Sequence, residues 1–334
     1  MRRALRTVPP AEEDERRRVR DLVALSEGDP LAPFTLRPEK AYVFSPDGAA
    51  AIGYRVRVGT AVAAGDPVGG LEAWDAAVDA FMSEMKRRGL RVAVLAAGER
   101  SQPSWARHGL HTIPIGRDVV LRRENFSVQG RRYRNLRQAI QRTRNAGVTV
   151  AFFREGELPA GDVAELRALM TATHREDKRG FSMILGRLFD GTESDAVVMV
   201  ARDKTGRIVG AHRYLWAGKQ DLSLDLPIRA KGAPNGVDER LIAEVVAWGS
   251  EHGVERVSLA FAPFPDLFVN RHHLSALQRL AYHAVHLLDP LIRVERLYLY
   301  LRKFHSFDQQ RFVMLRWRQV FVVALAALLL EFGN

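Results

Sequence analysis

Residues 129–147, QGRRYRNLRQAIQRTRNAG, constrain the fold more than any other stretch of the chain. Gly130 and Gly147 bracket the stretch, and a glycine just beyond the last turn is a common helix end. We therefore expect one helix between them. Its apolar side chains recur at helical spacing and form a single narrow stripe, made of Tyr133, Leu136 and Ile140.

The rest of this helix surface is cationic. The stretch has no acidic residue, and it carries six arginines: Arg131, Arg132, Arg134, Arg137, Arg142 and Arg144. Like charges this close repel one another, so acidic groups elsewhere or a polyanionic ligand must neutralise them. The helix lies between two segments that each have the pattern of a mixed α/β unit. We predict that it joins two domains and presents charge to a nucleic acid or a phosphate-bearing partner.

The overall composition agrees with an anionic partner. The chain has 334 residues, a formal net charge of +11 and a pI near 10.3. RNA, an anionic lipid or a phosphorylated small molecule would suit that charge, although an arginine-rich proteome would produce it too. With 47% hydrophobic residues, the chain can fill two cores. The absence of cysteine excludes disulfides, thiolate metal sites and thiol catalysis.

Helix and strand patterns divide the chain into two similar halves. Before the basic helix we expect helices at 11–27, 71–88 and 102–108, and strands at 41–45, 50–58, 60–64, 91–96, 111–115 and 118–121. After it we expect helices at 162–174, 236–252, 274–288 and 294–304, and strands at 148–153, 195–202, 207–216, 221–228, 255–261 and 310–315. These orders predict an α+β fold with two domains, each built on a mixed central sheet.

Neither end of the chain predicts a membrane span. Positive charge at the start is not followed by an apolar run, so no secretion signal is expected. The apolar run 320–330 would form a helix of about 16 Å, which is too short for a bilayer. We expect a buried C-terminal helix. A membrane-surface role is the alternative, because three arginines precede the run: Arg311, Arg316 and Arg318.

The polar stretch 223–239 is the strongest candidate for chemistry outside the basic helix. In a regular strand Ser223, Asp225 and Pro227 would share one face, with Leu224, Leu226 and Ile228 on the other. An aspartate in mid-strand either lines a cleft and binds a cationic group, such as an amino acid's ammonium, or lies exposed on an edge strand. Asn235 is expected to cap the following helix and Gly236 to form its turn.

Other candidates are weaker. His174 closes a predicted helix and is either a general base or part of a solvated face. Lys178 and Arg179 follow it and fit the anionic partner of the basic helix. Four histidines lie close in sequence, but no carboxylate or thiolate partners lie at metal-binding spacing, so no metal site is expected: His272, His273, His283 and His286.

Six motifs in order resemble one family. They are GDPVG (65–69), GRRYRNLRQAIQRTRNAG (130–147), KRGFSMILGRL (178–188), SLDLPIRAKGAPNG (223–236), VSLAFAPF (257–264) and LYLYLRKF (297–304). Together they resemble the cytosolic catalytic domain of the phosphatidylglycerol lysyltransferases, the multiple peptide resistance factor type, in its actinobacterial branch. The resemblance implies two tandem acetyltransferase-like (GNAT) domains joined by a long basic helix. The boundaries would be 1–128, 129–147 and 148–334, the last with the C-terminal apolar helix.

The resemblance also implies an activity and roles for named residues. Family members transfer an amino acid from aminoacyl-tRNA to a hydroxyl of a lipid head group, often phosphatidylglycerol. The arginine-rich helix, with Lys178 and Arg179, would hold the tRNA. Asp225 would hold the aminoacyl ammonium, and further substrate-binding positions would be Ser223, Arg229, Asn235, Gly236 and Lys303. Arg229 is the candidate replacement for a family arginine, because residues 225–228 read DLPI where the family often has DLMR.

The expected mechanism is direct attack of an acceptor oxygen on an activated ester, without a covalent enzyme intermediate or cofactor. His174 is the candidate base. The expected partners are aminoacyl-tRNA and an anionic phospholipid or membrane surface, and the expected location is cytoplasmic, peripheral at the inner face of the cell membrane. Three alternatives stay open: the same chemistry on a soluble acceptor, an acyl-CoA-dependent N-acetyltransferase, and a non-catalytic RNA- or membrane-binding module. The sequence does not indicate an oligomeric state.

Overall fold

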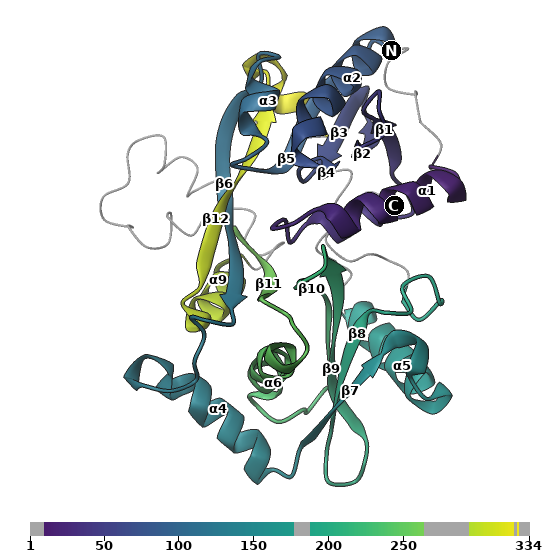
Figure 1. The fold of residues 1–334 in the computed structure, drawn as a ribbon. Helices are drawn as coiled ribbons and strands as arrows, with labels where there is room; N and C mark the ends of the chain where they lie inside the picture. Colours follow the sequence, from purple (N-terminus) through teal and green to yellow (C-terminus); the bar gives the residue numbers. More distant parts are fainter. Residues whose placement is uncertain (1–9, 177–187, 264–293, 324–325, 327–334) are drawn as a thin grey trace.

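A twelve-stranded mixed sheet runs through the molecule, in the order β1-β2-β3-β5-β12-β6-β11-β10-β9-β8-β7 with β4 paired to β2. The computed structural model describes residues 10–176, 188–263, 294–323 and 326 (Figure 1). The strands are β1 (Ala41–Phe44), β2 (Ala50–Arg57), β3 (Thr60–Ala64), β4 (Val68–Gly69), β5 (Arg91–Gly98), β6 (His111–Arg122), β7 (Thr149–Arg154), β8 (Val197–Arg202), β9 (Ile208–Ala217), β10 (Asp221–Arg229), β11 (Arg256–Pro263) and β12 (Phe307–Leu315).

Helices cover both faces of this sheet. The α-helices are α1 (Glu13–Leu25), α2 (Trp74–Arg87), α3 (Gln102–Ala106), α4 (Arg134–Asn145), α5 (Ala160–Glu176), α6 (Val237–Glu251) and α9 (Val294–Leu301). Single 3₁₀ turns are η1 (Ala32–Leu36), η2 (Leu71–Ala73), η3 (Arg131–Tyr133), η4 (Glu155–Glu157), η5 (Arg302–Phe304) and η6 (Trp317–Gln319). The expected helix 274–288 lies outside the described residues. No helix in the described ranges is both long and apolar enough to cross a bilayer.

The two halves of the chain repeat one order of elements. In each half, antiparallel strands are followed by a helix that crosses to a parallel strand: α2 leads to β5, which pairs with β3, and α6 leads to β11, which pairs with β10. Parallel neighbours require such a crossover. Each crossover helix buries an apolar stripe on its half of the sheet, through Phe81 and Met85 of α2 and through Leu241 and Val245 of α6.

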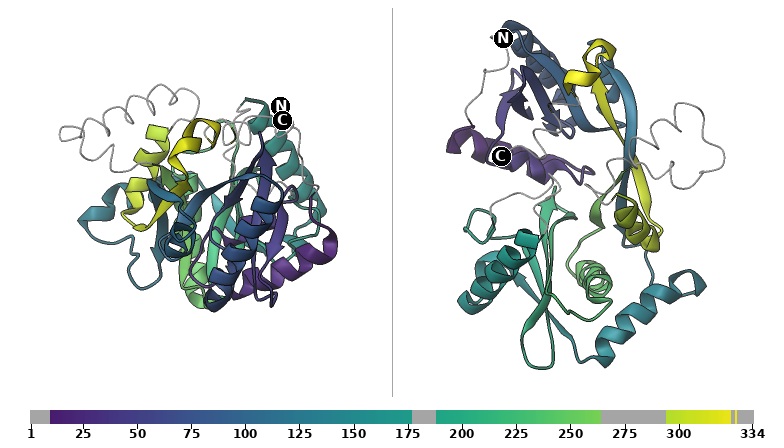
Figure 2. Two further views of the ribbon diagram at one scale, coloured as in Figure 1. Left: turned by 90° about the horizontal axis from the view of Figure 1, so that it is seen from above. Right: turned by 180° about the vertical axis from the view of Figure 1, so that it is seen from behind.

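The two expected sheets are in fact one continuous sheet. β6 pairs with β12 on one side and with β11 on the other, and β12 also pairs with β5. Residues 111–115 and 118–121, which we expected as two strands, form the single long strand β6. The physical reason is that each half alone would leave edge strands with unpaired backbone groups, and β6 and β12 pair those edges. Figure 2 shows both halves joined through this strand pair.

The basic stretch is helical as predicted, but shorter than its bracketing glycines allow. The turn η3 precedes α4, and Gly147 follows it with φ +74°. The narrow apolar stripe is confirmed, because Leu136 and Ile140 are buried in the core beneath α6 and Tyr133 packs against them. α4 lies at the outer edge of the second half (Figure 1). Its arginines are exposed.

Candidate functional site

A polar cluster lies where β9 and β10 meet the start of α6. The Arg229 guanidinium donates to Asp238 at 3.3 Å and to the side-chain oxygen of Asn235 at 3.2 Å. His212 lies 3.3 Å from the other Asp238 oxygen through its Nε2. Although burial opposes ionisation, the hydrogen bond and charge of His212, together with Arg229, hold the pKa of Asp238 below its ordinary value.

Two tyrosines complete this cluster, the buried Tyr214 and the partly buried Tyr300. His212 Nδ1 lies 3.0 Å from the Tyr214 hydroxyl, so a tyrosine, a histidine and an aspartate form one hydrogen-bonded chain. Burial raises the pKa values of Tyr214 and Tyr300 well above the ordinary value, so both hydroxyls stay protonated at neutral pH. Lys303 lies 5.1 Å from the Tyr300 ring centroid and donates to Glu239 at 3.0 Å.

Gly236 brings the basic helix against this cluster. It has φ +104°, and a Cβ at this position would lie 2.4 Å from the Ala139 carbonyl oxygen of α4. Only glycine permits that approach. Gly236 is also the N-cap residue of α6, so the expectation that Asn235 caps this helix is wrong. The reason is that the Asn235 side chain accepts its hydrogen bond from Arg229 instead of an α6 amide.

Asp225 lies apart from this cluster, on the opposite face of the sheet. It is buried and ion-paired with Arg213, whose guanidinium also pairs with Glu155. Neighbouring residues of β9 point to opposite faces, so Arg213 faces away from His212 and from α6. The exposed edge-strand alternative for Asp225 is therefore wrong, because β10 is paired on both sides over its first residues.

A β-bulge at Asp225 explains why the expected strand faces are wrong for the residues that follow it. Pairing with β9 shifts by one residue between Leu224 and Leu226. Leu222 and Leu224 pack in the core under α6, whereas Leu226 and Ile228 pack with Leu166 of α5 on the other face. The extra residue reverses the alternation. The bulge thus leaves Asp225 on the face of Arg213 and places Arg229 on the opposite face.

The trio of Glu155, Arg213 and Asp225 carries two acidic groups and one basic group. Each of the three side chains is at most 2% exposed. If both carboxylates are ionised, the trio has one net negative charge in a region of low dielectric.

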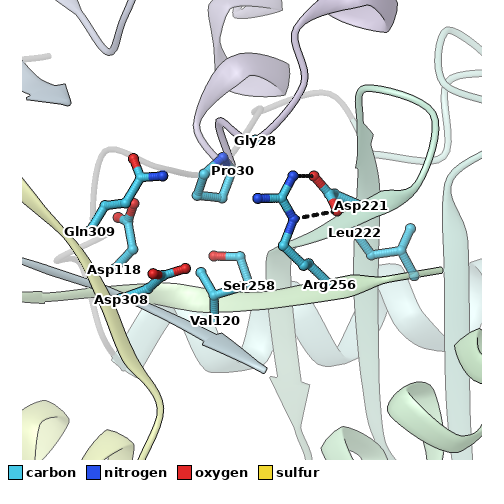
Figure 3. Close-up of a pocket in the computed structure, with 10 residues that line it drawn as sticks. All are labelled: Gly28, Pro30, Asp118, Val120, Asp221, Leu222, Arg256, Ser258, Asp308 and Gln309. Atoms are coloured by element: carbon cyan, nitrogen blue, oxygen red, sulfur yellow. Dashed lines mark hydrogen bonds and ion pairs between the residues drawn. The ribbon is translucent and has the colours of Figure 1, made fainter. Parts of the chain in front are cut away.

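A small pocket lies where the two halves meet, with about 270 Å³ of empty space (Figure 3). Residues from five segments line it: Gly28, Pro30, Asp118, Val120, Asp221, Leu222, Arg256, Ser258, Asp308 and Gln309. Arg256 forms a bidentate pair with Asp221, at 2.8 and 2.5 Å. Arg122 pairs with Asp308 at 2.8 Å. The pocket is thus polar and ordered by paired charges, and none of the predicted site residues lines it.

Behind this pocket Arg311 joins three aspartates. It is fully buried, and its guanidinium lies 2.6 Å from Asp29, 2.7 Å from Asp118 and 3.6 Å from Asp66. Burial raises the pKa of Asp118 to about 6, although Arg311 opposes that shift. Arg311 is therefore an internal ion-pair centre, and the expectation that it contributes to a membrane surface is wrong.

The arginines of the basic stretch fall into two groups. Arg132 donates to the His305 carbonyl at 3.0 Å, Arg137 donates to the Gly130 carbonyl at 2.6 Å, and Arg144 lies 3.8 Å from Glu244. The other three are exposed and have no hydrogen-bond or ion-pair partner among the described residues: Arg131, Arg134 and Arg142. These three are free to meet an external anion.

The sequence family described as phosphatidylglycerol lysyltransferase, C-terminal, matches residues 20–315. The chain belongs to this family. The match to this acyltransferase family includes all twelve described strands, the basic helix and the Arg229 cluster.

Two relatives are similar to this chain over nearly all of its length. The MprF-like domain protein Rv1619 of Mycobacterium tuberculosis is 45% identical over 94% of this chain. The lysylphosphatidylglycerol biosynthesis bifunctional protein LysX of Gordonia bronchialis is 32% identical over 95% of it. The chain spans 66% of the length of the first and 29% of the length of the second.

Two solved structures share the fold. The structure of L-PGS from Bacillus licheniformis has a TM-score of 0.84 at 19% identity, over 98% of this chain and 99% of that one. The C-terminal domain of a candidate lysylphosphatidylglycerol synthetase from Agrobacterium fabrum has a TM-score of 0.80 at 21% identity, over 96% and 98%. The mixed helix-and-sheet fold is thus that of these lysyltransferase-family domains.

The structure brings some predicted site residues together and separates others. Arg229, Asn235 and Gly236 meet at the start of α6, and Lys303 joins them through Glu239. Ser223 and Asp225 belong to the other face of β10. His174 is in the last turn of α5, and its side chain, with Lys178 and Arg179, lies outside the described residues. In the described part of the chain, no group of three or more His, Asp or Glu side chains is arranged to hold a metal ion.

Sequence reasoning missed four residues of these clusters. These residues are Glu155, His212, Arg213 and Asp238. The one signal in the sequence is that each is a polar or charged side chain within an apolar strand or at the start of a helix. The partners of these residues lie on other strands or helices, and local patterns do not show which.

Proposed function

We propose that this chain transfers an aminoacyl group from aminoacyl-tRNA to a hydroxyl of a membrane lipid head group such as phosphatidylglycerol. The observation that carries the proposal is the family match along residues 20–315. The name of the LysX relative, lysylphosphatidylglycerol biosynthesis protein, supports a lipid product. The exposed cations of α4, next to the Arg229 cluster, support a polyanionic donor.

The proposed architecture is two tandem GNAT-like domains, 1–128 and 148–334, joined by the basic segment 129–147. The repeated order of strands, crossover helix and parallel strand in each half supports it. In this proposal the second domain lends β12 to the first, because β12 pairs with β5 and β6.

The proposed chemistry needs little beyond positioning. The acceptor oxygen attacks the ester carbonyl carbon, a new ester bond forms, and the tRNA ribose hydroxyl leaves with a proton. His174 is the proposed base. Asp225, a buried carboxylate beside Arg213, is the proposed contact for the aminoacyl ammonium. The remaining proposed substrate contacts are Ser223, Arg229, Asn235, Gly236 and Lys303.

The decisive experiment supplies the purified chain with total tRNA charged with radiolabelled amino acids and with phosphatidylglycerol vesicles. We expect label in the organic phase, and ribonuclease treatment before mixing should abolish it. Label that is transferred but stays in the aqueous phase would point to a soluble acceptor. If the label stays on the tRNA whichever lipid or metabolite is supplied as acceptor, the chain does not transfer aminoacyl groups and the proposal is wrong.

The proposed tRNA contact predicts a change in salt dependence. Arg134→Glu combined with Arg142→Glu should weaken tRNA binding at least tenfold and flatten the plot of log affinity against log salt, because each phosphate contact adds about 0.9 to that slope for duplex nucleic acid. Filter binding at several salt concentrations measures both. A matched control is Arg17→Glu plus Arg87→Glu, two exposed helix arginines of the first half. If the slope of log affinity against log salt is the same for the α4 variant and the control variant, α4 does not contact tRNA.

A further inference from the structure

Two exposed aromatic side chains follow β12 at the far end of the first half. Trp317 is 57% exposed and Phe321 is 90% exposed. They are four residues apart in a helical segment, so they lie on one side of it. The opposite side is inward, because Val323 is buried against Ala93 and Leu315, with Val320 packed beside it. This short segment therefore presents aromatic groups where a surface helix normally presents polar ones.

The surroundings of these aromatics are cationic. Arg316 and Arg318 flank Trp317, and both are exposed. Arg316 donates only to the His108 carbonyl at 3.3 Å, and within the described chain neither arginine has a carboxylate partner. Trp317 stacks on the His111 ring with the centroids 5.5 Å apart, which holds the indole at the surface.

An open groove continues this surface between α2, the start of β5 and η6. It has about 1350 Å³ of empty space, and its cationic lining residues are Lys86, Arg91 and Arg316. Apolar side chains line it too, including Met82, Leu90 and Leu110, and no acidic residue does. Each acid of α2 has a partner: Asp75 pairs with Arg107, Glu84 pairs with Arg87 and Arg88, and Asp79 lies 2.7 Å from His108, which lines the groove.

We propose that Trp317, Phe321 and this groove form a docking surface for an anionic phospholipid bilayer. Aromatic side chains prefer the interface between head groups and acyl chains, where the ring is buried and the polar edge stays wet. Unpaired arginines beside them gain from the negative potential of anionic lipids. The positive charge of this surface favours an anionic bilayer over an uncharged apolar partner, because an uncharged partner would provide no anion for Lys86, Arg316 and Arg318. The link to an enzyme that acts on lipid rests on the proposed function, but the binding itself does not.

The test measures sedimentation of the full chain with vesicles of phosphatidylcholine alone or mixed equally with phosphatidylglycerol. Trp317→Ser plus Phe321→Ser should reduce binding to mixed vesicles at least tenfold, because most of the inserted apolar area is lost. Arg316→Gln plus Arg318→Gln should reduce it roughly fivefold per arginine, on the anionic vesicles only. Thermal unfolding midpoints close to that of the wild type would show that these exposed changes leave the fold intact.

Leu299→Ser provides the matched control. Leu299 is 46% exposed on α9, at the opposite end of β12, about 30 Å away along the strand. It should bind vesicles as the wild type does. Three results would each overturn the proposed surface. The aromatic variant could bind vesicles as the wild type does, or Leu299→Ser could lose as much binding as the aromatic variant. The aromatic variant could also change self-association without changing vesicle binding.

Transfer to detergent-dispersed phosphatidylglycerol separates this inference from the proposed function. If transfer proceeds there equally in wild type and aromatic variant while vesicle binding falls, both proposals stand. If no transfer occurs but the vesicle results hold, the docking surface stands and the proposed function fails. If transfer occurs and the variant still binds vesicles normally, the surface fails alone.

Discussion

Arg311→Met should cost the chain about 3–5 kcal/mol of folding free energy, a large share of the roughly 5–15 kcal/mol that stabilises a typical protein. The variant would leave Asp29, Asp66 and Asp118 buried without their shared cation. The surrounding structure cannot open to solvate them, because Arg311 sits on β12 between β5 and β6. Urea unfolding at pH 7, followed by circular dichroism, measures the loss.

The pH dependence of this variant has a defined sign. The folded-state pKa of Asp118 is already raised to about 6, above its unfolded value near 3.8, so the folded state binds the proton more tightly. Without Arg311 the folded pKa should rise further. Stability of Arg311→Met should therefore recover as the pH falls from 7 toward 5, whereas at neutral pH the ionised form is penalised.

Arg256→Met is the comparison for Arg311→Met. Arg256 also forms a bidentate pair with one aspartate, but its side chain is 23% exposed and it lines the central pocket. We expect a smaller loss, about 1–2 kcal/mol after allowance for solvent screening. Equal losses for the two variants, or an Arg311→Met chain as stable as the wild type, would show that the three buried aspartates do not depend on Arg311.

The second large effect concerns catalysis. Asp225→Asn should lower kcat/KM for aminoacyl-tRNA roughly 10- to 100-fold, because a hydrogen bond to a charged group contributes about 1.5–3 kcal/mol and the neutral amide no longer attracts the proposed ammonium. The isosteric change keeps the shape of the buried trio. Steady-state transfer of labelled amino acid to lipid, at several tRNA concentrations, gives the constant.

Glu155→Gln is the matched control for Asp225→Asn. Glu155 pairs with the same guanidinium of Arg213 and is equally buried, so both variants remove one charge from one ion-pair trio. Only Asp225 has the proposed substrate contact. We therefore expect similar losses of thermal stability but near-normal transfer by Glu155→Gln. A parallel loss of activity in both would reduce Asp225 to a structural partner of Arg213.

Short-range patterns predicted most of the individual elements. Glycines marked the ends of the basic stretch, and alternating apolar residues marked strands such as β2 and β9. The bulge at Asp225 was not predictable, because the sequence around it alternates regularly and the irregularity exists only in the pairing with β9. The single sheet was missed for a related reason, since β12 pairs with strands that lie about two hundred residues earlier in the chain.

The candidate site was predicted in its residue types more than in its grouping. The stretch around Arg229 and Asn235 was correctly seen as polar and dense, and the structure gathers it at the start of α6. The Arg229 cluster and Asp225 lie on opposite faces of the sheet because the bulge reverses the faces of the residues that follow Asp225. Two adjacent residues of β9 contact these two groups: His212 contacts Asp238 of the Arg229 cluster, and Arg213 contacts Asp225. They reach different groups because adjacent residues of a strand point to opposite faces.

The position of β12 has a consequence for synthesis on the ribosome. Residues 307–315 complete the ladder between β5 and β6, so these two strands keep unpaired edges until residue 315 has been translated. An open edge is a template for pairing with another nascent chain. Pairing of β12 is therefore a late step in forming this sheet, and a chain whose synthesis stops before residue 307 would expose the edges of β5 and β6.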